Sequence, residues 1–329
     1  LLNKIRTFLT TASRDSSMTP ITPDLLECLA AIVEEGGFEK AAKRLSITQS
    51  AVSQRLRTLE TQAGTVLIVR GRPLKPTPAG RLLLKHTMQM RLLHTDLEHD
   101  LRKLNPSTTG TSQTEDRVSI AVNADSIATW ALPAFDSLVG EGLPLEIIAD
   151  DQDFTQDWLR EGQVLGCVTT LAQAMRGCKV VPLGAMDYVA VATPQTLQKH
   201  CPAGISPQGV RKIPFIAFNR KDDLQAEFVR RAFRVKQINL RQCFVPSSEG
   251  QVRAVLAGWG ASVVPELLVR PQLESGQLIN LAPTAALPVN LYWHCWNLDS
   301  PLLDALTRAI TVAAGSALTA SPSVLPKTD

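Results

Sequence analysis

The feature that most constrains this sequence is a change of pattern on either side of a polar stretch, residues 105–116 (NPSTTGTSQTED). Before this stretch, apolar residues recur at helical spacing in segments that end at glycine or at tight turns. After it, over residues 117–315, short β-rich runs alternate with helical segments, which is typical of an α/β fold. The sequence therefore predicts at least two structural units joined by a flexible linker.

The first part of the chain predicts three short helices, at residues 23–35, 38–45 and 48–62. Thr48 is suited to an N-cap, and Gly64 is suited to ending the third helix. A β-rich run at residues 66–69 and a turn at residues 71–73 then predict a hairpin, or wing.

A long helix is predicted at residues 77–104. Such a helix is about 40 Å long, and its apolar residues form a seam too narrow for a core of its own. A seam of this kind is most simply buried against the same helix of a second copy. Packing of the helix on its own domain is the alternative.

Seven strands are predicted beyond the linker, at residues 118–122, 145–149, 164–168, 188–192, 215–218, 261–264 and 289–296. Helical patterns fall between them, as at residues 126–139 and 251–257. This alternation predicts a parallel α/β architecture. The length favours two lobes, with a ligand cleft at the carboxyl ends of the strands.

Positive charge is concentrated in the first part of the chain. Residues 36–91 hold eleven Lys and Arg against two acids, whereas from residue 105 onward 18 bases oppose 21 acids. A basic module attached to an acidic remainder is typical of a nucleic-acid-binding protein with a second function. A solvated charged surface explains the charge equally well on its own.

The third predicted helix has one apolar and one polar face. Val52, Leu56 and Leu59 recur at the spacing of a buried stripe. The opposite face predicts contacts with base edges from residues near the helix start, because Gln pairs with adenine and Ser serves either base or phosphate; these are Gln49, Ser50, Ser53 and Gln54. Contacts with the DNA backbone are predicted for Arg55, Arg57, Arg70, Arg72 and Lys75.

The stretch from Phe38 to Arg70 (FEKAAKRLSITQSAVSQRLRTLETQAGTVLIVR) resembles the winged helix-turn-helix of LysR-type transcriptional regulators. The most specific matches are Ala41-Ala42 with Leu45, the run from Ser50 to Ser53, Leu59-Glu60, Gly64 and Arg70. One departure is the sequence LIVR at residues 67–70, where most members have Leu-Phe-x-Arg.

The resemblance covers residues 20–315. It implies two α/β subdomains like those of periplasmic binding proteins, an effector cleft between them, and a homodimer or homotetramer that acts on RNA polymerase at promoter DNA. The implied boundaries are a disordered leader (1–18), a winged helix-turn-helix (19–76), a dimerisation helix (77–104), a hinge (105–116), subdomain I (117–181 and 285–315), subdomain II (182–284) and a flexible tail (316–329).

Three further segments resemble the arginine/lysine-responsive branch of that family: NADSIATWALPA at 123–134, DDQDFTQDWLREG at 150–162 and VPSSEGQVRAVLAGWGASVVPELLV at 245–269. This resemblance implies an activator of basic-amino-acid exporter genes, with L-lysine or L-arginine as effector and no cofactor. Asp187 departs from the branch, where a basic residue is usual.

An effector site is predicted where strands end. Ser126 and Thr129 follow the first strand at a helix start, where free backbone N–H groups suit a carboxylate, although plain helix capping is as good an explanation. Asp150, Asp151 and Asp153 suit the ammonium or guanidinium group of the effector; a solvated acidic loop is the alternative. Residues of the other lobe are expected to close over the ligand: Phe218, Asn219, Ser247, Ser248 and Glu249.

Other classes of function find little support. No nucleophile elbow, phosphate-binding loop, dinucleotide fingerprint or zinc-protease motif occurs, so no enzyme is predicted. The six cysteines contain no C-x-x-C pair and predict reduced core residues rather than a metal site. No apolar run suits a membrane helix, and the expected location is cytoplasmic. A LysR-type regulator of another effector, a periplasmic-type solute-binding protein and an architectural DNA-binding protein remain as alternatives.

Overall fold

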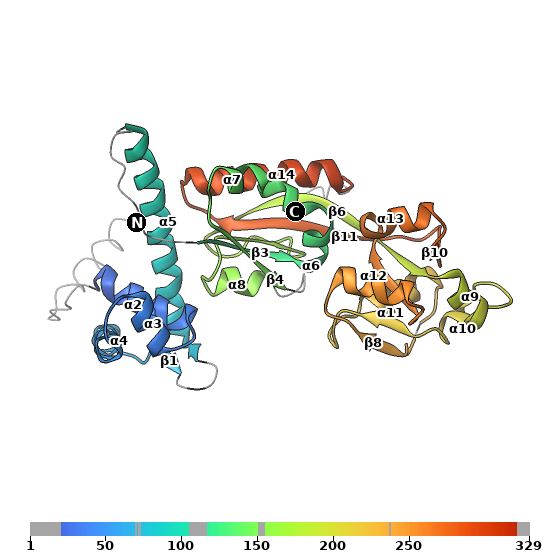
Figure 1. Cartoon of the computed structure of the whole chain (residues 1–329), viewed down its shortest axis with the longest axis horizontal. Coiled ribbons are helices and arrows are strands. Elements are labelled where there is room, and N and C mark those ends of the chain that lie inside the picture. The colour runs from blue at the N-terminus through green and yellow to red at the C-terminus, as the bar shows by residue number, and fades with distance from the viewer. Residues whose placement is uncertain are drawn as a thin grey trace, which may run out of the picture. The chain divides into compact units, whose positions relative to one another are not determined.

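The computed structural model of the protein describes residues 21–69, 71, 74–104, 117–150, 155–236 and 238–320. The chain divides into two compact units, residues 1–91 and residues 92–329, and helix α5 (Pro78–Leu104) passes through the boundary between them. Figure 1 shows a first unit built mainly of helices and a second unit built around a sheet. The predicted leader and hinge lie outside the described residues.

The first unit contains the three predicted helices, which are α2 (Pro23–Glu34), α3 (Phe38–Arg44) and α4 (Gln49–Ala63). Thr48 caps α4, because its side chain accepts a hydrogen bond from the backbone N–H of Ala51 at 3.2 Å. Gly64 ends the helix with a φ of 66°, in the left-handed region that glycine adopts without strain. The wing follows as two short antiparallel strands, β1 (Ile68–Val69) and β2 (Lys75–Pro76).

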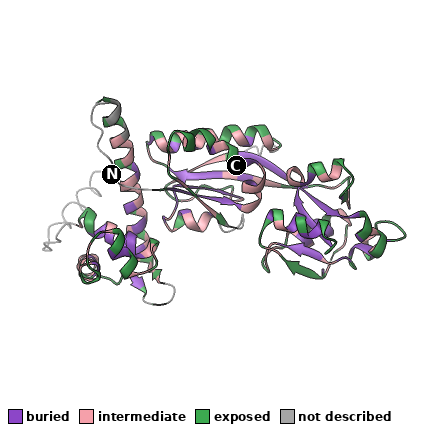
Figure 2. Cartoon of the chain, viewed as in Figure 1, coloured by how far each residue is buried: buried purple, intermediate pink, exposed green. Residues whose placement is uncertain are grey.

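The core of the first unit forms where α2, α3 and α4 meet. Val52, Leu56 and Leu59 of α4 are buried, which confirms the predicted apolar stripe. The Glu60 side chain accepts a hydrogen bond from the backbone N–H of Leu67 at 2.9 Å and ties the start of the wing to α4. With its apolar side fixed inward, α4 presents its other side to solvent (Figure 2).

An ion-pair network fastens α5 to the other helices. The Arg91 guanidinium donates to the Glu27 carboxylate at 2.9 Å and to the Glu34 carboxylate at 2.7 Å, and Glu34 also pairs with Arg44 of α3. The Arg91 side chain is only 13% exposed. Further along α5, the leucine side chains point into solvent, at Leu93, Leu97, Leu101 and Leu104.

The second unit is built on a nine-stranded sheet of order β4-β3-β5-β11-β6-β9-β7-β8, with β10 paired to β6. Subdomain I contributes β3 (Val118–Asn123), β4 (Leu145–Asp150) and β5 (Gly166–Thr169), which are parallel. Subdomain II contributes β7 (Phe215–Ala217), β8 (Gln242–Phe244) and β9 (Ala261–Pro265), also parallel, and the short β10 (Ile279–Asn280).

Two long strands connect the subdomains. They are β6 (Cys178–Ala192) and β11 (Leu287–Trp296), which pair with each other in antiparallel fashion. The prediction of a parallel α/β sheet therefore holds within each subdomain but is wrong for the pair that crosses between them. The sequence also predicted only the second part of β6, because residues 178–187 include a proline and a glycine and do not alternate regularly.

Helices cover both faces of the sheet. In subdomain I these are α7 (Asp136–Gly140), α8 (Thr155–Arg160), which lies on β3 and β5, and α14 (Pro301–Ala317), which lies on β6 and β11. In subdomain II they are α9 (Pro194–His200), α10 (Pro207–Val210), α11 (Leu224–Ala232), α12 (Ser248–Leu256) and α13 (Glu266–Glu274). Helix α14 extends beyond residue 315, and Thr319 bridges to Ala185 of β6.

The segment predicted as a regular helix at residues 126–139 is irregular in the structure. One turn of α-helix, α6 (Ala124–Ser126), leads into a π-helical turn, η1 (Ile127–Ala131), and a 3-10 turn, η2 (Leu132–Phe135), before α7. Pro133 lies in η2 and has no N–H to continue an α-helical ladder, which explains the change of helix type.

The tryptophans and cysteines test the predicted core. Trp293 and Trp296 of β11 are fully buried and form part of the core. All six cysteines are free thiols, and Cys28, Cys167, Cys201 and Cys295 are buried. The prediction is wrong for Cys243, which is exposed because β8 lies at the edge of the sheet.

Candidate nucleic-acid interface and ligand site

Helix α4 presents the predicted base-reading residues on its solvent face. Gln49, Ser50 and Gln54 are exposed and Ser53 is half-buried. The Ser50 hydroxyl lies 2.9 Å from the Thr48 hydroxyl, so both hydroxyls sit at the start of the helix. The N-terminus of α4 therefore offers side-chain donors and acceptors together with unpaired backbone N–H groups, which is the end that recognition helices direct at base edges.

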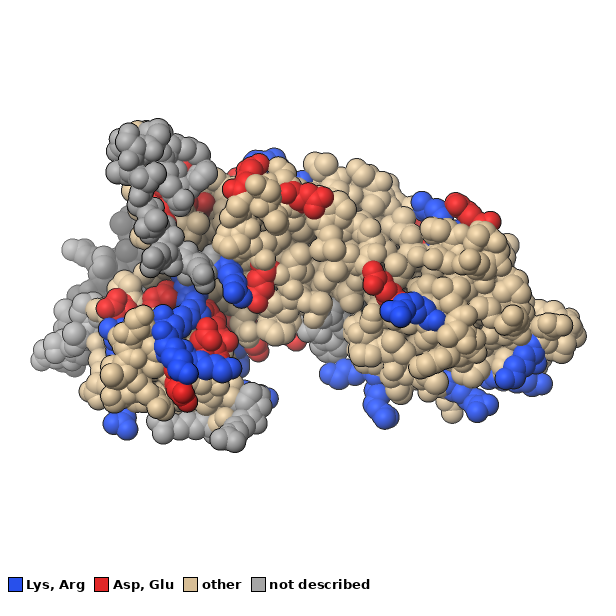
Figure 3. Space-filling view, viewed as in Figure 1, with Lys and Arg blue, Asp and Glu red and all other residues tan. Residues whose placement is uncertain are grey.

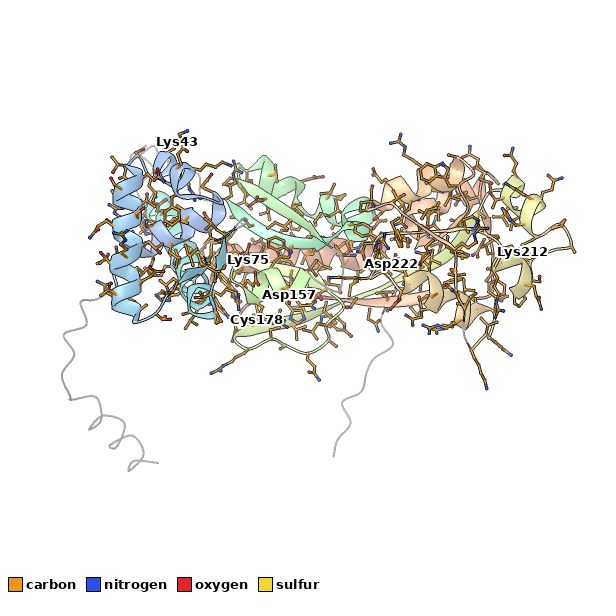
Figure 4. All side chains as sticks on the ribbon, turned by 90° about the horizontal axis from the view of Figure 1, so that it is seen from below. Lys43, Lys75, Asp157, Cys178, Lys212 and Asp222 are labelled. Atoms are coloured by element: carbon orange, nitrogen blue, oxygen red, sulfur yellow. The ribbon has the colours of Figure 1, made fainter. Side chains whose placement is uncertain are left out.

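Several predicted backbone contacts surround this face. Arg57 and Lys75 are exposed, and Lys75 lies on β2 of the wing (labelled in Figure 4). Arg55 is half-buried and lies 4.0 Å from Asp24 of α2, a distance at the limit of an ion pair. Arg70 and Arg72 lie outside the described residues, so only part of the predicted basic wing can be placed.

The register of the sheet brings two sets of strand ends to face each other. Strand β5 ends at Thr169, level with Tyr292 of β11 and hence with Pro182 of β6. Strand β9 runs in the opposite direction and ends at Pro265, level with Tyr188 of β6. The carboxyl ends of the two parallel sets therefore point toward each other across residues 182–188 of β6, a span of about 20 Å. This is where a ligand site is expected in a two-lobed α/β protein.

Buried polar atoms at the end of β3 lack partners within the described residues. The Asn123 side chain is 1% exposed, yet neither its Oδ1 nor its Nδ2 has a hydrogen-bond partner there. The Ser126 hydroxyl is fully buried and equally unpaired, and so is the indole N–H of Trp130. Because an unpaired buried polar group costs about 1–3 kcal/mol, this group is suited to a polar ligand.

The second lobe has a similar arrangement at the start of α12. Ser247 is the N-cap, and its hydroxyl accepts a hydrogen bond from Gly250 N–H at 3.1 Å. Ser248 is 3% exposed, and its hydroxyl has no partner among the described residues. The next residue, Glu249, is exposed. Of these three predicted effector contacts, Ser248 has the feature expected of a ligand-binding group, whereas Ser247 is used to cap the helix.

Phe218 and Asn219 are held within their own loop at the end of β7. The Phe218 N–H donates to Asp222 at 2.8 Å, and the Asn219 side chain accepts from the Lys221 N–H at 2.7 Å. Thr129 is also bound locally, since its hydroxyl donates to the Asp125 carbonyl at 2.6 Å. These predicted ligand contacts therefore already have hydrogen bonds in the structure.

Strand β6 is connected directly to the helix start that follows β3. The Tyr188 hydroxyl, on a fully buried side chain, donates to the Asp125 carboxylate at 2.6 Å. Asn123, Asp125 and Tyr188 were not among the predicted effector contacts. An asparagine as the last residue of an otherwise apolar strand was the available signal for the first of them.

Acidic residues also lie near the facing strand ends. Asp150 is the last residue of β4, and its Cα is paired with that of Asn123. Asp151 and Asp153 lie outside the described residues. On β6, burial raises the pKa of Asp187 above its usual range, the nearby Glu266 charge adds to this rise, and a hydrogen bond from Thr319 opposes it.

Neither a metal site nor a membrane-spanning helix is found in the described part of the chain. No group of three or more His, Cys, Asp or Glu side chains there is placed to hold a metal ion. None of its helices combines the length and the apolar character that crossing a membrane requires.

A winged helix-turn-helix joined to a two-lobed α/β domain defines a DNA-binding regulator that carries a ligand-binding module. Comparison with protein families agrees with this class. Residues 23–81 match the bacterial regulatory helix-turn-helix protein family of LysR type, and residues 111–314 match the LysR substrate binding domain. The protein belongs to the LysR family of transcriptional regulators and is not an enzyme.

Known relatives give a finer comparison. The chain is 42% identical to the transcriptional regulator LysG of Mycobacterium bovis over 289 residues, which are 88% of this chain and 92% of that protein. Its fold is similar to the crystal structure of ArgP from Mycobacterium tuberculosis, with a TM-score of 0.78, 39% identity, and coverage of 92% and 100% of the two chains. The full-length LysG of Corynebacterium glutamicum with bound effector Arg matches with a TM-score of 0.67 and 34% identity, covering 91% of this chain and all of that one. The protein is thus an effector-binding regulator of the ArgP/LysG type.

Proposed function

We propose that this regulator responds to L-lysine or L-arginine, and that the effector binds between the facing strand ends of subdomains I and II. The observation that carries the proposal is the set of polar atoms on Asn123, Ser126 and Ser248 that are buried where strands end and helices begin and that have no partner among the residues the structure describes. A zwitterionic ligand supplies both donors and acceptors to such atoms. The arginine bound to the related Corynebacterium LysG supports the same ligand class.

Each part of a basic amino acid has a suitable group in the site. The Asn123 amide can donate to the α-carboxylate through Nδ2 and accept from the α-ammonium through Oδ1. The Ser126 hydroxyl, one turn into the helix that starts after Asn123, can add a second donor. The ammonium or guanidinium group of the effector side chain is expected to pair with the acidic residues at the end of β4, among them Asp150.

In this proposal α4 reads promoter DNA through Gln49, Ser50, Ser53 and Gln54, while Arg55, Arg57 and Lys75 contact phosphates. The exposed leucines of α5 pair with α5 of a second copy, since an exposed apolar seam on a long helix is most simply buried against its equivalent. Binding of the effector changes how the regulator engages promoter DNA or RNA polymerase. The target we propose is the gene of a basic-amino-acid exporter, which the regulator activates.

Calorimetric titration of the full chain with L-lysine, L-arginine and L-lysinamide tests the effector assignment. Wild type is expected to bind the first two, and to lose about ten- to hundredfold in affinity when the carboxylate of lysine is replaced by an amide, because charge-assisted hydrogen bonds contribute about 1.5–3 kcal/mol. In Asn123→Asp the new carboxylate repels that of lysine, so lysine and lysinamide should bind almost equally.

Asn280→Asp is the matched control. Asn280 lies on β10 and its side-chain oxygen accepts from Ala282 N–H at 2.9 Å, a bond that aspartate keeps. This variant should discriminate lysine from lysinamide as wild type does. Absence of binding of either basic amino acid to wild type would refute the effector class. Binding by wild type with unchanged discrimination in Asn123→Asp would remove Asn123 from the site.

A further inference from the structure

A carboxylate of subdomain I is held directly against the crossing strand β6. The Tyr188 hydroxyl donates to the Asp125 carboxylate at 2.6 Å, and the Tyr188 side chain is fully buried. Tyr188 lies level with Pro265, the last residue of β9, and with Leu287 of β11. The Asp125 carboxylate therefore lies beside the span of β6 that separates the facing strand ends of the two lobes.

Two further contacts fix the backbone around Asp125. The Thr129 hydroxyl donates to the Asp125 carbonyl at 2.6 Å and lies 3.9 Å from the sulfur of Met186. Met186 and Tyr188 are two residues apart on β6, so their side chains lie on the same face of the sheet. Thr129 belongs to the π-helical turn η1, and turns of this type are frequent at functional sites. The position of the Asp125 carboxylate is thus set by contacts to the crossing strand rather than by a free loop.

Asp125 is also a close neighbour of the side chains to which the proposed function assigns the α-carboxylate of the effector. Asn123 lies two residues before it and Ser126 one residue after it, and both are buried without partners among the described residues. In an α-amino acid the carboxylate and the ammonium group are attached to the same carbon. A ligand whose carboxylate is bound by Asn123 and Ser126 therefore brings its ammonium group to the same end of β3.

A purely structural role explains only part of this arrangement. A buried tyrosine hydroxyl needs a hydrogen-bond partner, and Asp125 supplies one. A neutral acceptor would be enough for that purpose, whereas a carboxylate adds a negative charge and offers about four acceptor positions, of which the hydroxyl occupies one. A negative charge close to a bound carboxylate is unfavourable unless a cation lies between them. The α-ammonium group is a cation that the ligand itself brings to this place.

We propose that Asp125 accepts hydrogen bonds from the α-ammonium group of the effector, and that Tyr188 is the positioning residue that holds the Asp125 carboxylate. The inference rests on the proposed function and deepens it, because it states which ligands the site rejects. Lysine and arginine each carry an α-ammonium group and a side-chain cation. The site then offers one acidic group for each, Asp125 for the first and the acids at the end of β4 for the second. Ligands without an α-ammonium group are therefore expected to bind weakly.

Calorimetric titration of the full chain with L-lysine and ε-aminocaproate tests the inference, because ε-aminocaproate is lysine without its α-ammonium group. Wild type is expected to bind lysine about ten- to hundredfold more tightly than ε-aminocaproate, since hydrogen bonds between charged groups are strong. Asp125→Asn keeps an acceptor for the Tyr188 hydroxyl but removes the charge. In this variant lysine should lose most of its advantage, whereas the affinity for ε-aminocaproate should not fall, because the charge that repels its carboxylate is gone.

Tyr188→Phe tests the positioning role. This substitution keeps the buried ring and removes the hydroxyl, so the Asp125 carboxylate loses the donor that orients it. The preference for lysine over ε-aminocaproate should fall about two- to tenfold, which is less than in Asp125→Asn. A lower melting temperature with an unchanged preference would show that this hydrogen bond serves stability alone.

Ser119 and Glu146 provide matched controls. The Ser119 hydroxyl donates to the Glu146 carboxylate at 2.7 Å, a pair of the same kind in the same subdomain. Ser119 lies on β3 about 13 Å before Asn123. Acidic side chains occur at several separate places on the second unit (Figure 3), so a general loss of negative charge has to be distinguished from the loss of Asp125. Ser119→Ala and Glu146→Gln should leave the preference within about twofold of wild type, since salt screens charges at that distance.

Three results would overturn the inference. Equal binding of lysine and ε-aminocaproate by wild type would show that the α-ammonium group is not recognised. A preference that persists in Asp125→Asn would assign this group to other residues, and an equal loss of both ligands in that variant would show only a structural role. Failure of wild type to bind lysine or arginine at all would instead refute the proposed function.

Discussion

Replacing Arg91 with Met should selectively destabilise the first unit of the protein. Arg91 joins α5 to α2 through hydrogen bonds to Glu27 and Glu34, and its own side chain is 13% exposed. Methionine preserves the apolar stem and helix propensity but leaves both carboxylates without this partner. The substitution therefore tests the ion-pair network rather than the packing.

The magnitude follows from the burial of the partners. Removing one member of a fully buried ion pair costs about 3–5 kcal/mol, while an exposed pair contributes about 0.2–1 kcal/mol. Glu27 and Glu34 are 37% and 34% exposed, so water partly solvates the carboxylates that remain. We expect a loss of about 2 kcal/mol, between these limits. For a unit of this size that corresponds to a melting temperature lower by about 10 °C.

The distribution of tryptophan provides the assay. All five tryptophans lie beyond residue 92, in the second unit, so intrinsic fluorescence reports on that unit alone. Far-UV circular dichroism also reports on the helices of the first unit. In Arg91→Met the dichroism should gain an early transition, while the fluorescence midpoint should remain that of wild type. Lys85→Met, on the same helix and with no ion pair in the described part of the chain, is the control.

Acid should reduce the difference between variant and wild type. Burial alone would raise the pKa of Glu34, but the charges of Arg91 and Arg44 and their hydrogen bonds outweigh it and lower that pKa. A lowered folded-state pKa gives stability that is present above the unfolded value, about 4.3, and is lost as the pH falls toward the folded value. Equal melting curves for the two proteins at pH 7, or a deficit that grows in acid, would refute the role assigned to this network.

Four further variants test other parts of the molecule. Gln54→Ala should weaken specific promoter binding by about 1–3 kcal/mol while non-specific binding persists, as fluorescence anisotropy with operator and scrambled duplexes can measure. Thr48→Ala removes the cap of α4 and should cost about 1 kcal/mol of stability, seen in the dichroism transition. Leu97→Asp on the exposed seam of α5 should shift the mass in light scattering toward the monomer. Neutralising Asp150 and Asp151 should abolish the response to lysine and arginine in a promoter-binding assay, and a retained response would exclude them from the site.

The first unit was predictable because its structure is encoded locally. The cap at Thr48, the stop at Gly64 and the stripe of Val52, Leu56 and Leu59 each depend on residues within one helix or its ends. The α/β class and most strands of the second unit were predictable for the same reason, since alternation and apolar runs are local patterns.

The crossing strands were not predictable in full, because their pairing is decided by distant residues. Strand β6 pairs with β11 across about a hundred residues of sequence, and its first part includes Pro182 and Gly184. Proline and glycine argue against a strand when only the local sequence is read. The irregular turns after Ser126 were missed for a related reason, because a single proline decides the type of helix there but leaves the apolar spacing intact.

The candidate ligand residues fall into two groups: those whose side chains already form a hydrogen bond within their own loop or helix, and those whose side chains do not. Ser247 and Ser248 are neighbours of the same type, and sequence alone treats them alike. In the structure the Ser247 hydroxyl accepts a hydrogen bond from the backbone of α12, whereas the Ser248 hydroxyl is buried and has no partner among the described residues. Asn123 reaches the same condition at the end of β3. Burying a polar side chain without a hydrogen-bond partner is unfavourable, so a bound ligand that supplies the partners would remove this cost. Asn123 belongs to one lobe and Ser248 to the other. A ligand that pairs with both would join the two lobes, which is why its affinity should depend on Asn123 and Ser248 together more than on either alone.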